Sequence, residues 1–170
     1  MELKEIVRDI PDFPEKGIIF KDITPLLKDA DAFEEGISKL AGHFKEKDFD
    51  YIVGIEARGF IVGAPLALYL KKGFVPIRKP GKLPADTISA SYELEYGKNV
   101  IEIHKDALQN GDRVLLIDDL LATGGTIKAA IELIESLGAE VIELGFLMEL
   151  SFLKGRQQLE GYDIFSLLIE

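Results

Sequence analysis

Residues 114–126 read VLLIDDLLATGGT, and this stretch decides which fold the chain adopts. Its first four residues are branched and apolar, which is typical of a strand buried on both faces of a parallel sheet. Two carboxylates, Asp118 and Asp119, follow at once, and a loop of small residues then leads into a helical pattern. Because ligands of parallel α/β folds bind at the carboxyl ends of strands, this junction is a candidate binding site.

The loop ATGGT (122–126) favours an anion. Backbone N–H groups at a helix start, left uncovered by two glycines, form a cradle for phosphate, and two threonines add hydroxyl donors. The neighbouring carboxylates accept hydrogen bonds from sugar hydroxyls or bind a hard divalent cation. An interpretation without any binding role would make TGGT a flexible turn and Asp118 a helix cap. The complete pattern of strand, acids, loop and helix favours a phosphorylated ribose with Mg²⁺.

The rest of the chain predicts alternating strands and helices, which indicates an α/β fold with a mostly parallel central sheet flanked by helices. Apolar runs predict strands at 51–55, 74–79, 113–117, 140–150 and 165–169. Helical spacing predicts an amphipathic helix within 22–47, an apolar one over 61–70 and a third over 127–137, ended by Gly138. No linker interrupts this order, so residues 1–170 are expected to form one domain.

One segment does not fit this alternation. Residues 79–98 contain two prolines and two glycines with little early periodicity. Such a segment inside a domain is usually functional or mobile. Its second half predicts a hairpin that turns around Gly97-Lys98-Asn99.

Composition excludes several classes of function. The 170 residues carry a net charge of −10, which argues against nonspecific binding to nucleic acid or to an anionic membrane. Without cysteine there is no thiolate chemistry, and two histidines, His43 and His104, are too few for a rich metal site. The N-terminus lacks the pattern of a signal peptide, and no apolar run is long enough to span a bilayer, so a cytoplasmic protein is expected.

VLLIDDLLATGGT resembles the signature with which type I phosphoribosyltransferases bind phosphoribosyl pyrophosphate (PRPP). Further pieces, in order along nearly the whole chain, resemble the branch of that family that acts on adenine. These pieces are FKDITPLL (20–27), GIEARGF (54–60), VPIRKPGKLP (75–84), SYELEYG (91–97), DDLLATGGT (118–126) and LKGRQQL (153–159). The resemblance implies transfer of phosphoribose from PRPP to N9 of adenine, giving AMP and pyrophosphate. It also implies Mg²⁺, a homodimer, and a flexible hairpin or loop that closes over the active site.

The same resemblance assigns roles to residues of this chain. Asp118 and Asp119 hold the ribose hydroxyls and are candidate Mg²⁺ ligands, Arg58 meets the pyrophosphate, and Glu95 handles the proton of the purine. The substrate-binding set is Ile19, Phe20, Lys21, Ala57, Arg78, Lys79, Lys82, Tyr96, Ala122, Thr123, Gly124, Gly125 and Thr126.

Within that set the parts of the substrates are divided. Phe20 stacks on adenine, with backbone groups of its two neighbours reading the exocyclic amine. The five residues of ATGGT hold the 5′-phosphate. Arg78, Lys79 and Lys82 belong to the closing segment, and the Glu56-Ala57 peptide is where the family often has a cis bond.

Two other functions stay open. One is a phosphoribosyltransferase for hypoxanthine, guanine or xanthine, against which the base-site segment FKDITP argues. The other is a regulator that binds PRPP without turnover. Such proteins usually carry an added nucleic-acid-binding domain, and this chain of 170 residues shows none.

Overall fold

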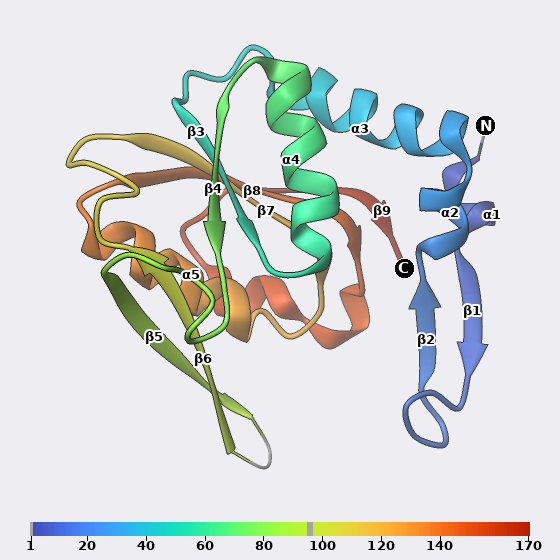
Figure 1. The fold of residues 1–170 in the computed structure, drawn as a ribbon. Coiled ribbons are helices and arrows are strands. Elements are labelled where there is room, and N and C mark those ends of the chain that lie inside the picture. The colour runs from blue at the N-terminus through green and yellow to red at the C-terminus, as the bar shows by residue number, and fades with distance from the viewer. Residues whose placement is uncertain (1, 95–96) are drawn as a thin grey trace.

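The computed structural model describes residues 2–94 and 97–170, and its centre is a five-stranded parallel sheet (Figure 1). The strands lie in the order β4-β3-β7-β8-β9, and every neighbouring pair is parallel. Their bounds are β3 Tyr51–Ile55, β4 Gly73–Ile77, β7 Arg113–Leu121, β8 Glu140–Glu149 and β9 Ile164–Ile169. The α/β class and the mostly parallel sheet are confirmed.

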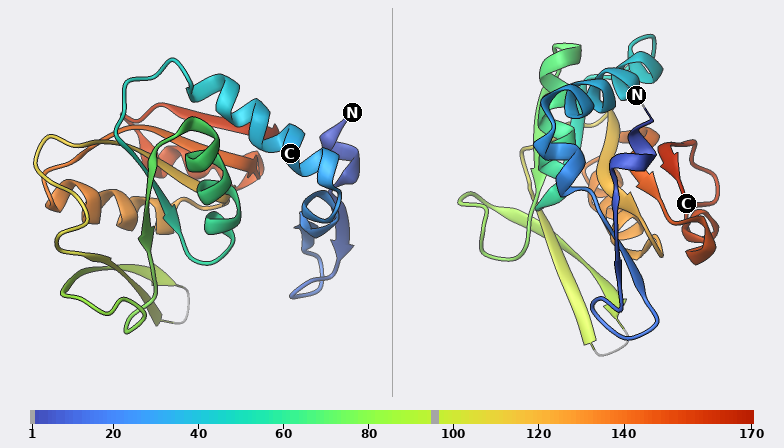
Figure 2. Two further views of the ribbon diagram at one scale, coloured as in Figure 1. Left: turned by 45° about the horizontal axis from the view of Figure 1, so that its top comes forward. Right: turned by 90° about the vertical axis from the view of Figure 1, so that its right-hand side faces the viewer.

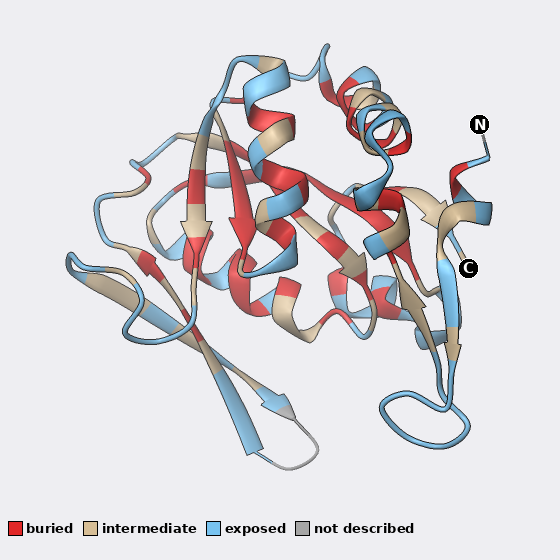
Figure 3. Ribbon diagram, turned by 45° about the vertical axis from the view of Figure 1, so that its right-hand side comes forward, coloured by how far each residue is buried: buried red, intermediate tan, exposed pale blue. Residues whose placement is uncertain are grey.

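Helices cover both faces of this sheet (Figure 2). Helices α3 (Ala30–Phe44) and α4 (Arg58–Leu70) pack on one face, and α5 (Gly125–Ser136) packs on the other. Side chains of β7 alternate between the two hydrophobic clusters: Leu115 and Ile117 join α3 and α4, whereas Val114 and Leu116 join α5. Each strand is therefore apolar on both sides, and Figure 3 shows this buried centre.

Two antiparallel hairpins flank the end of the sheet toward which β4 runs (Figure 1). One pairs β1 (Arg8–Pro11) with β2 (Ile19–Asp22), and the other pairs β5 (Thr87–Leu94) with β6 (Gly97–His104). The remaining elements are α1 (Leu3–Ile6), α2 (Thr24–Lys28) and two 3-10 helices, η1 (Ser151–Leu153) and η2 (Gly155–Leu159). The sequence patterns did not predict the first hairpin or either 3-10 helix.

Several predicted boundaries are wrong, and pairing explains the largest error. Strand β7 does not end at Ile117 but continues to Leu121, because β8 keeps pairing with it as far as Leu121 and Glu149. On its other side, pairing with β3 stops at Ile117. The two aspartates therefore lie in the part of β7 that pairs with β8 but no longer with β3.

Two further corrections are local, and one helix is confirmed. The helix after β3 begins at Arg58, so this residue opens α4 instead of lying in a preceding loop. The amphipathic helix predicted within 22–47 is α3, which the Asp29 carboxylate caps by accepting a hydrogen bond from the Ala32 N–H at 2.9 Å. Gly97-Lys98-Asn99 is not the hairpin turn, since these residues belong to β6 and pair with 92–94.

Candidate active site

The two aspartates of β7 meet the first residue of α4. Arg58 Nε lies 2.9 Å from Asp119 Oδ2, and Asp119 is only 6% exposed. The Arg58 guanidinium carbon also lies 6.0 Å from the centre of the Phe20 ring on β2. One arginine thus connects the carboxylates of the sheet to the aromatic residue of the N-terminal hairpin, and these three predicted site residues are brought together.

Asp118 lies under the start of α4. A Cβ added to Gly59 would lie 2.8 Å from Asp118 Oδ1, so only glycine lets the helix approach this carboxylate so closely. The Asp119 N–H donates to the same oxygen at 2.8 Å. Burial, and then the negative charge of Asp119, raise the pKa of Asp118 well above its usual value. The site therefore holds two carboxylates whose joint ionisation is unfavourable.

This raised pKa predicts a stability effect that depends on pH. An acid whose pKa is higher in the folded than in the unfolded state loses stabilisation as the pH rises from the unfolded value, near 3.8, through the folded one. We therefore expect Asp118→Asn to raise the thermal midpoint at about pH 8 and to lose this advantage near the unfolded pKa. Thermal melts across pH measure this difference, with the exposed Asp106→Asn as control. An advantage independent of pH would contradict it.

The phosphate loop, residues 122–126, follows β7 and includes the first two residues of α5. It surrounds a small cavity of about 70 Å³, which Asp118 and Ile127 also line. Gly124 has φ +89°, a conformation that favours glycine, and no side chain caps the first turn of α5. The N–H groups of that turn are therefore available to an anion, as the sequence predicted.

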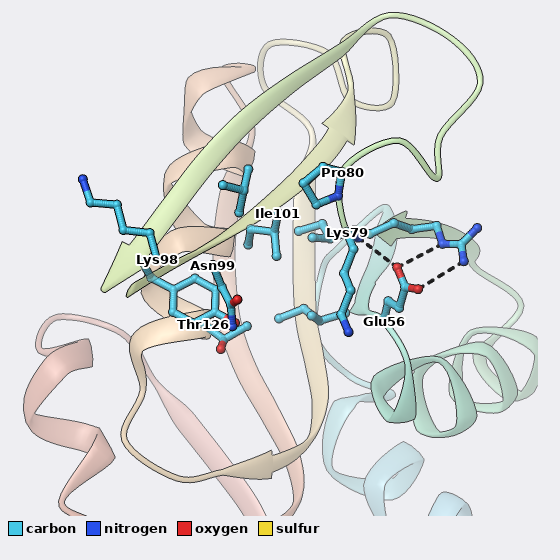
Figure 4. A pocket seen from close by; sticks show the side chains of 12 residues that line it. Glu56, Lys79, Pro80, Lys98, Asn99, Ile101 and Thr126 are labelled. Carbon is cyan, nitrogen blue, oxygen red and sulfur yellow. Dashed lines mark hydrogen bonds and ion pairs between the residues drawn. The ribbon is translucent and has the colours of Figure 1, made fainter. Parts of the chain in front are cut away.

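Basic residues of the stretch that follows β4 line a second cavity, of about 360 Å³ (Figure 4). Arg78 and Lys79 lie on its wall together with Lys98 of β6, and Thr126 of the phosphate loop reaches the same space. Arg78 donates twice to the Glu56 carboxylate, at 3.2 Å each, and the Lys79 N–H donates to it at 2.8 Å. The Lys79 N–H, followed by Arg78, lowers the pKa of Glu56, which keeps this carboxylate ionised.

The segment after β4 is also held by Glu102 of β6. Arg78 and Glu102 exchange two backbone hydrogen bonds, of 3.0 and 2.7 Å. The Glu102 carboxylate accepts from the Gly81 N–H at 2.8 Å and from the Thr87 hydroxyl at 3.0 Å, and these bonds lower its pKa. Residues 78–87 are therefore hydrogen-bonded to β6 at both ends.

A third cavity, of about 600 Å³, lies beside the N-terminal hairpin and is mostly apolar. The predicted base-site residues Ile19, Phe20 and Lys21 all line it. The Lys21 ammonium lies 2.6 Å from Asp9 Oδ1, so a carboxylate already pairs with its charge. The Phe13 ring packs edge-on against Phe20, with 5.1 Å between ring centres, and fixes its orientation.

The remaining predictions have mixed outcomes. The Glu56-Ala57 peptide, which precedes Arg58, is cis. Lys82 does not line any of the three cavities. The proposed catalytic Glu95 and its neighbour Tyr96 lie outside the described residues, so their roles stay predictions.

The sequence patterns missed part of the base cavity. Leu120 of β7 lines it, together with Leu150, Phe152 and Leu153 from the segment after β8. The piece LKGRQQL lies in that segment and belongs to the resemblance, which was the one available signal, but it carried no assigned role. Lys98 on the wall of the second cavity was also missed, because it was taken for a turn residue.

Comparisons with known proteins define the class of this site. Residues 24–167 match the model of the phosphoribosyl transferase domain. A protein of Halothermothrix orenii named adenine phosphoribosyltransferase is 71% identical over all of both chains. This chain belongs to the adenine phosphoribosyltransferase family.

Solved structures agree with this assignment. The crystal structure of adenine phosphoribosyltransferase from Thermoanaerobacter pseudethanolicus has a TM-score of 0.96 at 60% identity and covers 99% of this chain and 98% of its own. The enzyme of Saccharomyces cerevisiae, complexed with adenine and an imino-altritol bisphosphate, has a TM-score of 0.92 at 46% identity, covering 98% and 97% of the two chains.

Proposed function

We propose that this protein transfers the 5-phosphoribosyl group of PRPP to N9 of adenine, giving AMP and pyrophosphate in purine salvage. The observation that carries this proposal is the position of Arg58 between the base cavity and the paired carboxylates: it contacts Asp119 at 2.9 Å and lies 6.0 Å from the Phe20 ring. A base stacked on Phe20 would lie next to a ribose held by the aspartates. The phosphate loop adjoins the same aspartates, because Asp118 lines its cavity.

The reaction breaks the bond from C1′ of the ribose to pyrophosphate and forms a bond from C1′ to N9 of adenine. Positive charge develops on the ribose between these events, and Asp118 and Asp119, holding the ribose hydroxyls, would stabilise it. The loss of the N9 proton requires an acceptor, which we assign to Glu95 by its match to the family pattern. Arg58, with Arg78 and Lys79, would meet the negative charge of the leaving pyrophosphate.

Asp118 and Asp119 suit a Mg²⁺ ion that enters the site together with PRPP. Among residues 2–94 and 97–170, no cluster of three His, Asp or Glu side chains could hold a metal ion. Magnesium commonly takes one or two carboxylates and completes its shell with substrate phosphates and water, which fits the two aspartates of β7. Bound there, it would neutralise part of the pyrophosphate charge.

The family resemblance also supports a homodimer in the cytoplasm, and we include both in the proposal. Exposed apolar side chains on α4 suit burial against a second copy, since Leu68 is 82% and Tyr69 56% exposed. Within the described residues no helix is long and apolar enough to cross a membrane.

We expect PRPP with Mg²⁺ to slow tryptic cleavage of the 79–98 segment, because closure over the substrate would bury its lysines. Lys79 precedes a proline and resists trypsin, so Lys82 and Lys98 are the informative sites. Mass spectrometry of timed digests measures both, with the exposed Lys45 at the end of α3 as an internal control. Equal cleavage of Lys82 with and without PRPP would argue against closure.

The proposed reaction is tested by its stoichiometry. Purified protein is incubated with adenine, PRPP and Mg²⁺, and AMP and pyrophosphate are measured separately over time. The proposal requires both products to appear in equal amounts. Release of pyrophosphate without AMP would indicate hydrolysis of PRPP instead of transfer.

A further inference from the structure

The segment that follows β8, residues 150–159, touches both the base cavity and the phosphate loop. Its first part supplies Leu150, Phe152 and Leu153 to the wall of the base cavity. Its second part lies against the phosphate loop: a Cβ on Gly124 would lie 2.8 Å from the Gly155 carbonyl oxygen. A displacement of this segment would therefore change both places at once.

The contact with the phosphate loop is close on both sides. A Cβ on Gly155 would overlap the Ala122 carbonyl oxygen and lie 2.9 Å from the Leu121 side chain. The Leu150 N–H donates to the Leu121 carbonyl at 3.0 Å, where β7 gives way to the loop. Backbone therefore packs directly on backbone where Gly155 meets Ala122 and Gly124.

One ion pair, between the half-exposed Arg156 and the buried Glu149, anchors this segment to the sheet. Arg156 of η2 donates two parallel hydrogen bonds, of 2.7 and 2.8 Å, to the carboxylate of Glu149 at the end of β8. Glu149 is only 4% exposed, and the Ser166 hydroxyl of β9 donates to it at 2.6 Å. Such a forked pair fixes orientation as well as distance. Neither Glu149 nor Arg156 lines the base cavity or the phosphate-loop cavity.

We propose that Glu149 and Arg156 are positioning residues, which set segment 150–159 so that the base cavity and the phosphate loop lie at the separation that a nucleoside monophosphate spans. This inference rests on the proposed function, because AMP would place its base against Phe20 and its phosphate in the loop. Pyrophosphate would bind on the other side of the site, at Arg58 and Arg78, which segment 150–159 does not support. Loss of a positioning role should weaken the binding of AMP alone, whereas a general loss of structure should weaken the binding of both AMP and pyrophosphate.

The test compares AMP with Mg²⁺-pyrophosphate by calorimetry in wild type, Arg156→Met, Arg156→Lys and the double variant Glu149→Gln, Arg156→Met. Arg156→Met leaves a buried carboxylate unpaired and is expected to lower the thermal midpoint. The double variant removes that lone charge and recovers much of the midpoint. We nevertheless expect its Kd for AMP to rise about tenfold, with the Kd for pyrophosphate within about twofold of wild type. Arg156→Lys should be intermediate, because an ammonium cannot make the fork.

Arg113→Met is the matched control, since Arg113 pairs with Asp48 at 2.7 Å at the start of β7, far along the strand from the phosphate loop. It should bind both ligands as wild type does. Unchanged AMP affinity in the double variant, or equal loss of AMP and pyrophosphate, would overturn the positioning role. A wild-type protein that makes no AMP would instead overturn the proposed function, and this inference with it.

Discussion

We expect the double variant Asp118→Asn, Asp119→Asn to lower turnover by roughly a hundredfold or more while the fold is retained. Asparagine keeps the shape of each side chain and an oxygen that can accept from a neighbouring N–H, such as the bond from the Asp119 N–H to Asp118. It removes the negative charge that would face the ribose as positive charge develops. It also leaves Arg58 without its carboxylate partner on β7. The chemical step should therefore suffer far more than the stability.

Steady-state kcat with saturating PRPP and adenine is the measurement, together with circular dichroism and a thermal melt for each variant. Asp106→Asn, on an exposed residue, serves as the control and should turn over as wild type does. Because Asp118 has a raised pKa in the free protein, its single variant should be at least as stable as wild type at neutral pH. Near-normal turnover in the folded double variant would remove the assigned role of the carboxylates.

Gly124→Ala should raise the KM for PRPP by roughly tenfold or more, because the phosphate loop has no room for a methyl group at this position. The backbone is left-handed here, at φ +89°, and the new Cβ would lie 2.8 Å from the Gly155 carbonyl oxygen. That neighbour is backbone and cannot rotate away, so the loop itself must move. The KM for adenine should change less, since the Phe20 wall of its cavity is not displaced.

Gly111→Ala separates the contact from the backbone strain. Gly111 has φ +90°, nearly the same as Gly124, but a Cβ there meets nothing within 4 Å. Both variants therefore carry a similar conformational cost, of roughly 1–2 kcal/mol, and only one disturbs the loop. Steady-state kinetics of the two variants give the comparison. An equal rise in the KM for PRPP in both would show that strain, and not the contact with Gly155, causes the loss.

The strands of the sheet were predictable because their signal is local. Continuous apolar runs such as 51–55 and 114–117 reported burial on both faces, and the structure has strands there. The end of β7 was not predictable from its own residues, since pairing with β8 carries it four residues past Ile117. The β1–β2 hairpin was missed for a related reason: its strands have four residues each, none of these residues is buried, and β1 includes a proline.

In the site, too, features formed by consecutive residues were predictable, whereas contacts between distant segments were not. The proposed phosphate loop consists of consecutive residues, so its role could be predicted from the sequence alone. The contact of Arg58 with both Asp119 and the neighbourhood of Phe20 joins three distant segments, and only the resemblance suggested it. The Glu149–Arg156 pair was not predicted at all, because each residue alone looks like an ordinary charged residue on the surface. Its meaning appears only when β8, β9 and η2 come together.

The most direct test of the account is the choice of base. Protein, PRPP and Mg²⁺ are mixed separately with adenine, hypoxanthine, guanine or xanthine, and the nucleotides are separated by chromatography. We predict AMP from adenine and no nucleotide from the 6-oxopurines, because the cavity around Phe20 is lined mainly by apolar side chains and its one lysine is paired with Asp9. Nucleotide formed from a 6-oxopurine, with none from adenine, would contradict it.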